Sequence, residues 1–70
     1  MFARAFHNNQ HTKRFTIIQT DRFWEVPEEQ DSHVVRRVVY DDWHRVERAR
    51  KAFARQAESL CEAGWVESQA

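Results

Sequence analysis

Residues 33–40, with the sequence HVVRRVVY, decide the fold because they form the most β-prone segment of the chain. Two adjacent arginines lie between two pairs of valines. Neighbouring side chains of a strand point to opposite faces of a sheet, so each face receives valines and one arginine, Arg36 or Arg37. This strand therefore needs a partner for a cation on both of its faces.

Two further strands are predicted before this segment. RFTIIQT (14–20) and RFWEV (22–26) are rich in β-branched and aromatic residues. Pro27 has no amide hydrogen, so it is expected to stop the second of these strands or confine it to a sheet edge. Short connections between consecutive strands favour an antiparallel meander of three strands.

One long helix is predicted after the third strand. Asp41 or Asp42 can cap its first amide groups, and no Gly or Pro occurs before Gly64. LCEAGW (60–65) is typical of a Schellman ending, in which Trp65 packs against Leu60. The expected fold class is α+β: a three-stranded antiparallel meander followed by one long C-terminal helix packed on one sheet face. The apolar residues at helical spacing are Val46, Ala49, Phe53, Ala57 and Leu60.

Seventy residues correspond to one domain. Residues 13–66 are expected to form it, and residues 67–70 a short tail. Residues 1–12 are mostly polar, so we expect a flexible N-terminal arm that is ordered only if its phenylalanines, Phe2 and Phe6, are bound.

A turn at Gln30–Asp31 would satisfy both arginines of the third strand. It places Glu25 opposite Arg36 and Trp24 opposite Arg37. The face that remains away from the helix is then too apolar to be bare, and a second copy of the chain is expected to cover it. The alternatives are the N-terminal arm and a foreign partner. The expected interface residues are Ile18, Phe23, Val34, Arg36, Val38 and Tyr40.

Composition limits the function classes. Eleven basic and eleven acidic residues give zero net charge, which implies no bulk attraction to nucleic acid or to an anionic membrane. No apolar run approaches the roughly 18 residues of a membrane span, and the first ten residues lack the apolar region of a signal peptide. A single cysteine excludes an internal disulfide framework. We therefore expect a cytoplasmic protein without a membrane partner.

No motif for catalysis, a metal or a cofactor is present in the sequence. Four histidines (His7, His11, His33 and His44) and Cys61 could ligate a metal. His7 and His11 are four residues apart, which would suit a metal on a helix, but the two asparagines between them are poor helix formers and no partner motif follows. Cys61 is expected to be an inert core thiol. The serines lack the setting of a nucleophile, and one glycine cannot form a phosphate-binding loop. We expect no enzyme activity, no metal and no cofactor.

The sequence therefore predicts a small non-enzymatic interaction or regulatory module that acts as a homodimer. Two alternatives stay open. One is a DNA-binding regulator that uses the basic half of the helix, namely Arg45, Arg48, Lys51 and Arg55. The other is a protein inhibitor or adaptor that docks on a larger complex through the acidic segment DRFWEVPEEQDS (21–32).

Overall fold

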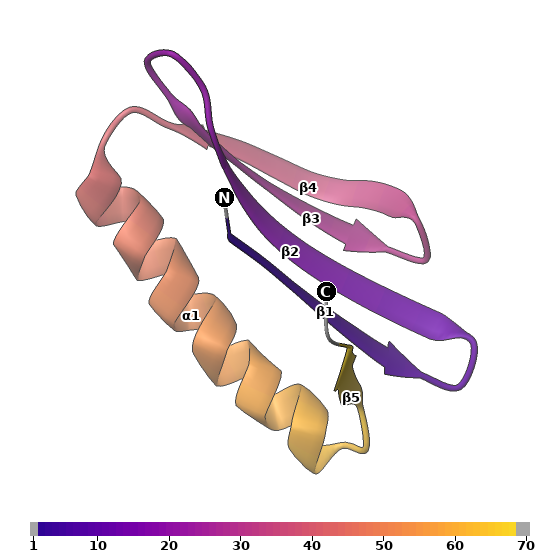
Figure 1. Cartoon of the computed structure of the whole chain (residues 1–70). Coiled ribbons are helices and arrows are strands. Elements are labelled where there is room, and N and C mark those ends of the chain that lie inside the picture. Colours follow the sequence, from indigo (N-terminus) through magenta and orange to yellow (C-terminus); the bar gives the residue numbers. More distant parts are fainter. Residues whose placement is uncertain (1, 69–70) are drawn as a thin grey trace.

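The computed structural model describes residues 2–68 and shows one helix packed on an antiparallel sheet (Figure 1). The predicted α+β class and single helix are confirmed, but the sheet has five strands instead of three, in the order β4-β3-β2-β1-β5. The elements are β1 (Phe2–Asn8), β2 (His11–Gln19), β3 (Trp24–Gln30), β4 (His33–Tyr40), α1 (Trp43–Glu62) and β5 (Val66–Ser68).

The N-terminal segment is a strand of the sheet and not an arm outside it. β1 pairs antiparallel with β2 along its whole length, with Phe2 opposite Ile17 and Asn8 opposite His11. Its alternation places Phe2, Arg4 and Phe6 on the face that the helix covers. This strand is difficult to predict from the sequence, because its only large apolar residues, Phe2 and Phe6, are four positions apart. The expected tail at 67–70 begins within β5, and residues 69 and 70 lie outside the described residues.

The predicted register of β4 is wrong. The hairpin turns at Asp31–Ser32, whose φ angles are 52° and 69°, and not at Gln30–Asp31. Arg36 lies opposite Glu28 and Arg37 opposite Pro27, so the expected pairs of Arg36 with Glu25 and of Arg37 with Trp24 do not form. Arg36 is shifted by three residues along β3. Since side chains alternate, this odd shift exchanges the faces of Arg36–Tyr40, whereas Val34 keeps its expected face because the pairing shifts between Glu28 and Glu29.

Pro27 does not end its strand, contrary to prediction. β3 continues to Gln30, and Pro27 is buried within it. The pairing of β2 with β3 is interrupted opposite this proline, which has no amide hydrogen to donate. β3 therefore accommodates the proline in the middle of the sheet.

Both predicted ends of the helix are confirmed. The Asp42 side chain accepts a hydrogen bond of 2.9 Å from the amide of His44, and this caps the N-terminus of α1. At the other end the amide of Trp65 donates to the carbonyl of Leu60 at 2.9 Å, and Gly64 has a φ of +99°. These contacts define a Schellman motif, and Trp65 packs against the core as predicted.

The core lies between α1 and the middle of the sheet. Three phenylalanines form its centre: the rings of Phe15 and Phe53 stack with centroids 4.1 Å apart, and Phe6 lies 6.0 Å from Phe53. The prediction that Cys61 is a core thiol is wrong, because Leu60 takes the buried position and the next residue is exposed. The buried apolar residues are Phe6, Phe15, Ile17, Val26, Val46, Phe53, Ala57 and Leu60.

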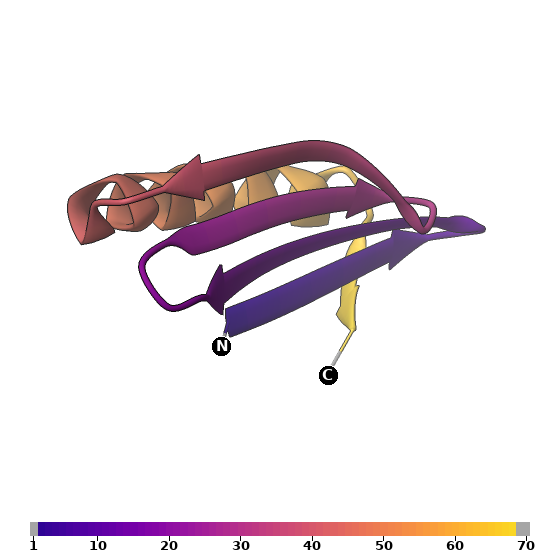
Figure 2. The same ribbon diagram turned by 90° about the horizontal axis from the view of Figure 1, so that it is seen from above.

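The helix crosses the sheet diagonally. It begins shortly after β4, at one edge of the sheet, and ends shortly before β5, at the other edge (Figures 1 and 2). The start of β4 is therefore left uncovered, and Val35 is 62% exposed. No helix within residues 2–68 has the length and apolar character needed to cross a bilayer.

Candidate binding groove

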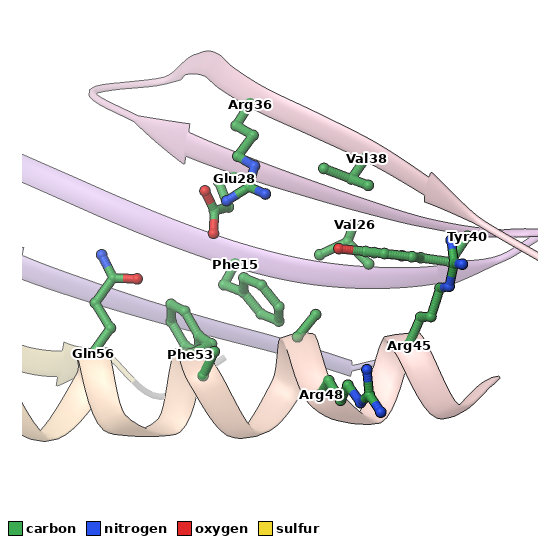
Figure 3. A pocket seen from close by; sticks show the side chains of 12 residues that line it. Phe15, Val26, Glu28, Arg36, Val38, Tyr40, Arg45, Arg48, Phe53 and Gln56 are labelled. Atoms are coloured by element: carbon green, nitrogen blue, oxygen red, sulfur yellow. The ribbon is translucent and has the colours of Figure 1, made fainter. Parts of the chain in front are cut away.

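A groove of about 520 Å³ opens between α1 and the β3–β4 hairpin (Figure 3). It exists because the diagonal helix leaves the sheet uncovered on this side. Its apolar floor consists of Phe15, Val26, Val38, Ala49, Ala52 and Phe53. Its polar rim consists of Glu28, Arg36, Tyr40, Arg45, Arg48 and Gln56.

Two elements distant in the sequence supply the three arginines of the rim. Arg45 and Arg48 are three residues apart on α1 and therefore share one side of the helix. Arg36 comes from β4, and the observed register turns it toward α1 together with Val38 and Tyr40. Figure 3 shows Arg36 above the groove and Arg45 rising from the helix below it. The small side chains of Ala49 and Ala52 leave the space between β4 and the helix open.

The groove carries an excess of positive charge. Among the described residues that line it, Glu28 is the only carboxylate, and it lies opposite Arg36 on β3. Among residues 2–68, none of the three groove arginines has a carboxylate oxygen within 4.0 Å. Their guanidinium donors are therefore available to a ligand.

Two arginines outside the groove, Arg4 and Arg50, are paired with carboxylates. Arg4 donates two hydrogen bonds of 2.8 Å to Glu67, and Arg50 donates one of 3.0 Å to Glu47. The bond from Arg4 holds the pKa of Glu67 below its ordinary value, and the pKa of Arg4 is raised mainly by the same contact. The first pair joins β1 to β5 and the second lies within α1, whereas no such pair engages the three groove arginines among residues 2–68.

The structure divides the expected nucleic-acid contacts. Arg45 and Arg48 lie in the groove. Lys51 lies on the other flank of the helix, in a shallow hollow beside Phe2, and Arg55 is exposed. The expected basic stripe is therefore not one surface directed at one ligand.

The six expected interface residues also fall into separate places. Arg36, Val38 and Tyr40 line the groove on the helix side. Ile18 and Val34 pair with residues of the opposite face, and Phe23 lies in the loop between β2 and β3. Self-association was expected on the sheet face that points away from the helix. This face has Thr16 and Pro27 at its centre, bordered by Glu25 and Arg37.

Two of the four histidines, His7 and His11, make contacts between strands or turns at the ends of the sheet. His7 Nδ1 lies 2.9 Å from Ser68 Oγ, and His11 Nδ1 lies 3.2 Å from the Asp31 carboxylate. The amide of Thr12 donates to Asp31 and is the main cause of the lowered pKa of that carboxyl, with His11 second. Within the described part of the chain, no three His, Cys, Asp or Glu side chains are grouped so that they could hold a metal ion.

Sequence reasoning missed Glu28, Gln56 and the groove itself. A signal was present on the helix, since Arg45, Arg48, Ala49, Ala52 and Gln56 share one side of α1 at helical spacing. The contribution of Arg36 depends on the register of β4, which the sequence placed wrongly.

Comparison with known proteins identifies no relative. No protein-family model matches this chain, and no curated protein or solved structure shows significant similarity to it.

Proposed function

We propose that this chain is a non-enzymatic interaction module that binds an acidic segment of another protein in the groove between α1 and the β3–β4 hairpin. One observation carries the proposal. Arg36, Arg45 and Arg48 line the same groove from two elements, beside an apolar floor, and no carboxylate oxygen lies within 4.0 Å of them among the described residues. Such a site suits a ligand that has both carboxylates and apolar side chains.

The shape and charge of the site favour a protein segment over other ligands. The groove is open along the helix, whereas small-molecule sites enclose most of their ligand. A sugar–phosphate backbone would pair with the arginines but would leave the apolar floor without a partner. Zero net charge further argues against nucleic acid, because modules that bind it are usually strongly basic.

We do not expect the chain to self-associate through the sheet face that points away from the helix. Such self-association required six residues on one surface, and Arg36, Val38 and Tyr40 lie on the helix side instead. Sedimentation equilibrium tests the matter directly, and we expect the mass of a monomer at micromolar concentration.

Fluorescence anisotropy with a labelled peptide of alternating leucine and glutamate tests the groove. We expect the double variant Arg45→Gln/Arg48→Gln to bind about tenfold more weakly or worse, because two charge-assisted contacts are lost. The matched control is Lys51→Gln/Arg55→Gln, which removes the same charge from the same helix outside the groove. We expect the control to bind nearly as well as the unchanged chain.

Duplex DNA is the competing probe in the same assay. If DNA binds more tightly than the peptide, and both double variants weaken it with a steep salt dependence, the basic helix is a nucleic-acid surface and the proposal is overturned. Equal loss of peptide binding in both variants also overturns it, since binding would then follow total charge.

A further inference from the structure

Strand β4 is an open edge of the sheet. It is the first strand in the sheet order, so it pairs with β3 on one side only. Backbone N–H and C=O groups on its other side are directed outward, as at any sheet edge. Val34 and Val39 are 51% and 53% exposed. An edge of eight residues with such side chains is a template for another strand.

The two arginines oppose pairing between copies of this chain. In an antiparallel pair related by a two-fold axis, the residue at the axis lies opposite its own copy. The centre of β4 falls between Arg36 and Arg37, so an axis near the centre places like guanidinium groups directly opposite each other. Like charges in that position are destabilising. An axis nearer either end avoids this contact but shortens the paired stretch.

We propose that β4 accepts an extended acidic segment of another protein as a sixth strand, with two adjacent carboxylates opposite Arg36 and Arg37. The inference rests on the proposed function, because Arg36 belongs to both sites, and it adds how the partner binds. Charge complementarity selects this occupant, since neighbouring residues of an added strand point to the two faces that the two arginines occupy.

The regular part of the edge is Arg36–Tyr40. The pairing of β3 with β4 shifts between Glu28 and Glu29, which leaves Val35 as the extra residue of a bulge. Beyond the bulge, β4 is paired with β3 without interruption up to Tyr40. A strand along this stretch would bring its carboxylate on the helix side to the groove arginines and its flanking residues beside Val38 and Val39.

Peptides in which two adjacent glutamates lie between two pairs of valines test this mode of binding. We expect the peptide to bind and its version with two lysines to bind at least about tenfold more weakly. Two N-methylated versions of the peptide are also made, one methylated at the odd-numbered residues and the other at the even-numbered residues. Each version, or phase, lacks the amide donors along one edge of the extended peptide. Strand addition requires that only one phase loses binding, and any other pattern overturns it.

Two substitutions separate this inference from the groove. Arg37→Ala lies outside the groove and is expected to weaken the glutamate peptide about tenfold, while Arg22→Ala, an equal loss of charge in an exposed loop, is expected to have little effect. If Arg37→Ala and both N-methylated phases bind normally but Arg45→Gln/Arg48→Gln does not, strand addition fails and the groove stands. If binding is weakened only by Arg37→Ala and by one N-methylated phase, the proposed groove site is overturned and strand addition at β4 is supported.

Discussion

The two hairpins of the sheet, β1–β2 and β3–β4, have opposite surroundings. In the half formed by β1 and β2, Phe6 and Phe15 are each 1% exposed, whereas Val35 at the β4 edge is 62% exposed. A helix is about 10 Å wide and strands lie about 4.8 Å apart, so one helix can cover only two or three strands. The diagonal path of α1 decides which part of this sheet is core and which part is available for binding.

The largest effect is expected in the covered half. Phe15→Ala removes a ring that stacks on Phe53 and is expected to cost about 3–5 kcal/mol of unfolding free energy. A domain of this size has only about that much stability, so the variant should be largely unfolded. Urea denaturation followed by circular dichroism measures the change.

The matched substitution in the open half is Val35→Ala. It is expected to cost less than about 1 kcal/mol, because the side chain is mostly in water already. Equal losses of unfolding free energy in the two variants would show that the β4 edge is covered in solution. The difference between the two halves of the sheet would then be contradicted.

Removing charge from the open half should change its behaviour next most strongly. Arg36→Val/Arg37→Val leaves an uncharged edge of valines, which is expected to pair with itself. Sedimentation should then show at least about a doubling of the mean mass under conditions in which the unchanged chain is monomeric. A monomeric double variant would show that the arginines are not what prevents self-association at this edge.

The end of the helix offers a smaller and more local test. Gly64 has a φ of +99°, a region in which any other residue is strained, so Gly64→Ala is expected to lose about 1–2 kcal/mol. The exposed Ser59→Ala on the same helix should change stability by less than about 0.5 kcal/mol. Thermal melts of the two variants, side by side, provide the measurement.

The smallest effect concerns the ion pair that joins β1 to β5. The pKa of Glu67 is lowered in the folded state by Arg4, so its contribution to stability is present above about pH 4 and is lost as the pH falls through the folded pKa. Glu67→Gln removes this dependence. Urea unfolding at pH 6 and pH 3 should show a larger acid-induced loss for the unchanged chain, by less than about 1 kcal/mol. Identical losses would contradict the role of the pair.

The sequence by itself determined the α+β class, the helix and both of its caps. These features depend on contacts between residues only a few positions apart, such as Asp42 with His44 and Trp65 with Leu60. Local chemistry is sufficient for such contacts, because the same few residues supply both partners.

Only the tertiary structure decided the strand β1, the register of β4 and the groove. β1 exists as a strand because β2 pairs with it and α1 buries Phe6. The register depends on a turn at Asp31–Ser32 that lacks the usual Asn-Gly signal, and a shift of three residues moves Arg36 from one face to the other. The groove then follows from the helix crossing that strand at an angle, which no local pattern encodes.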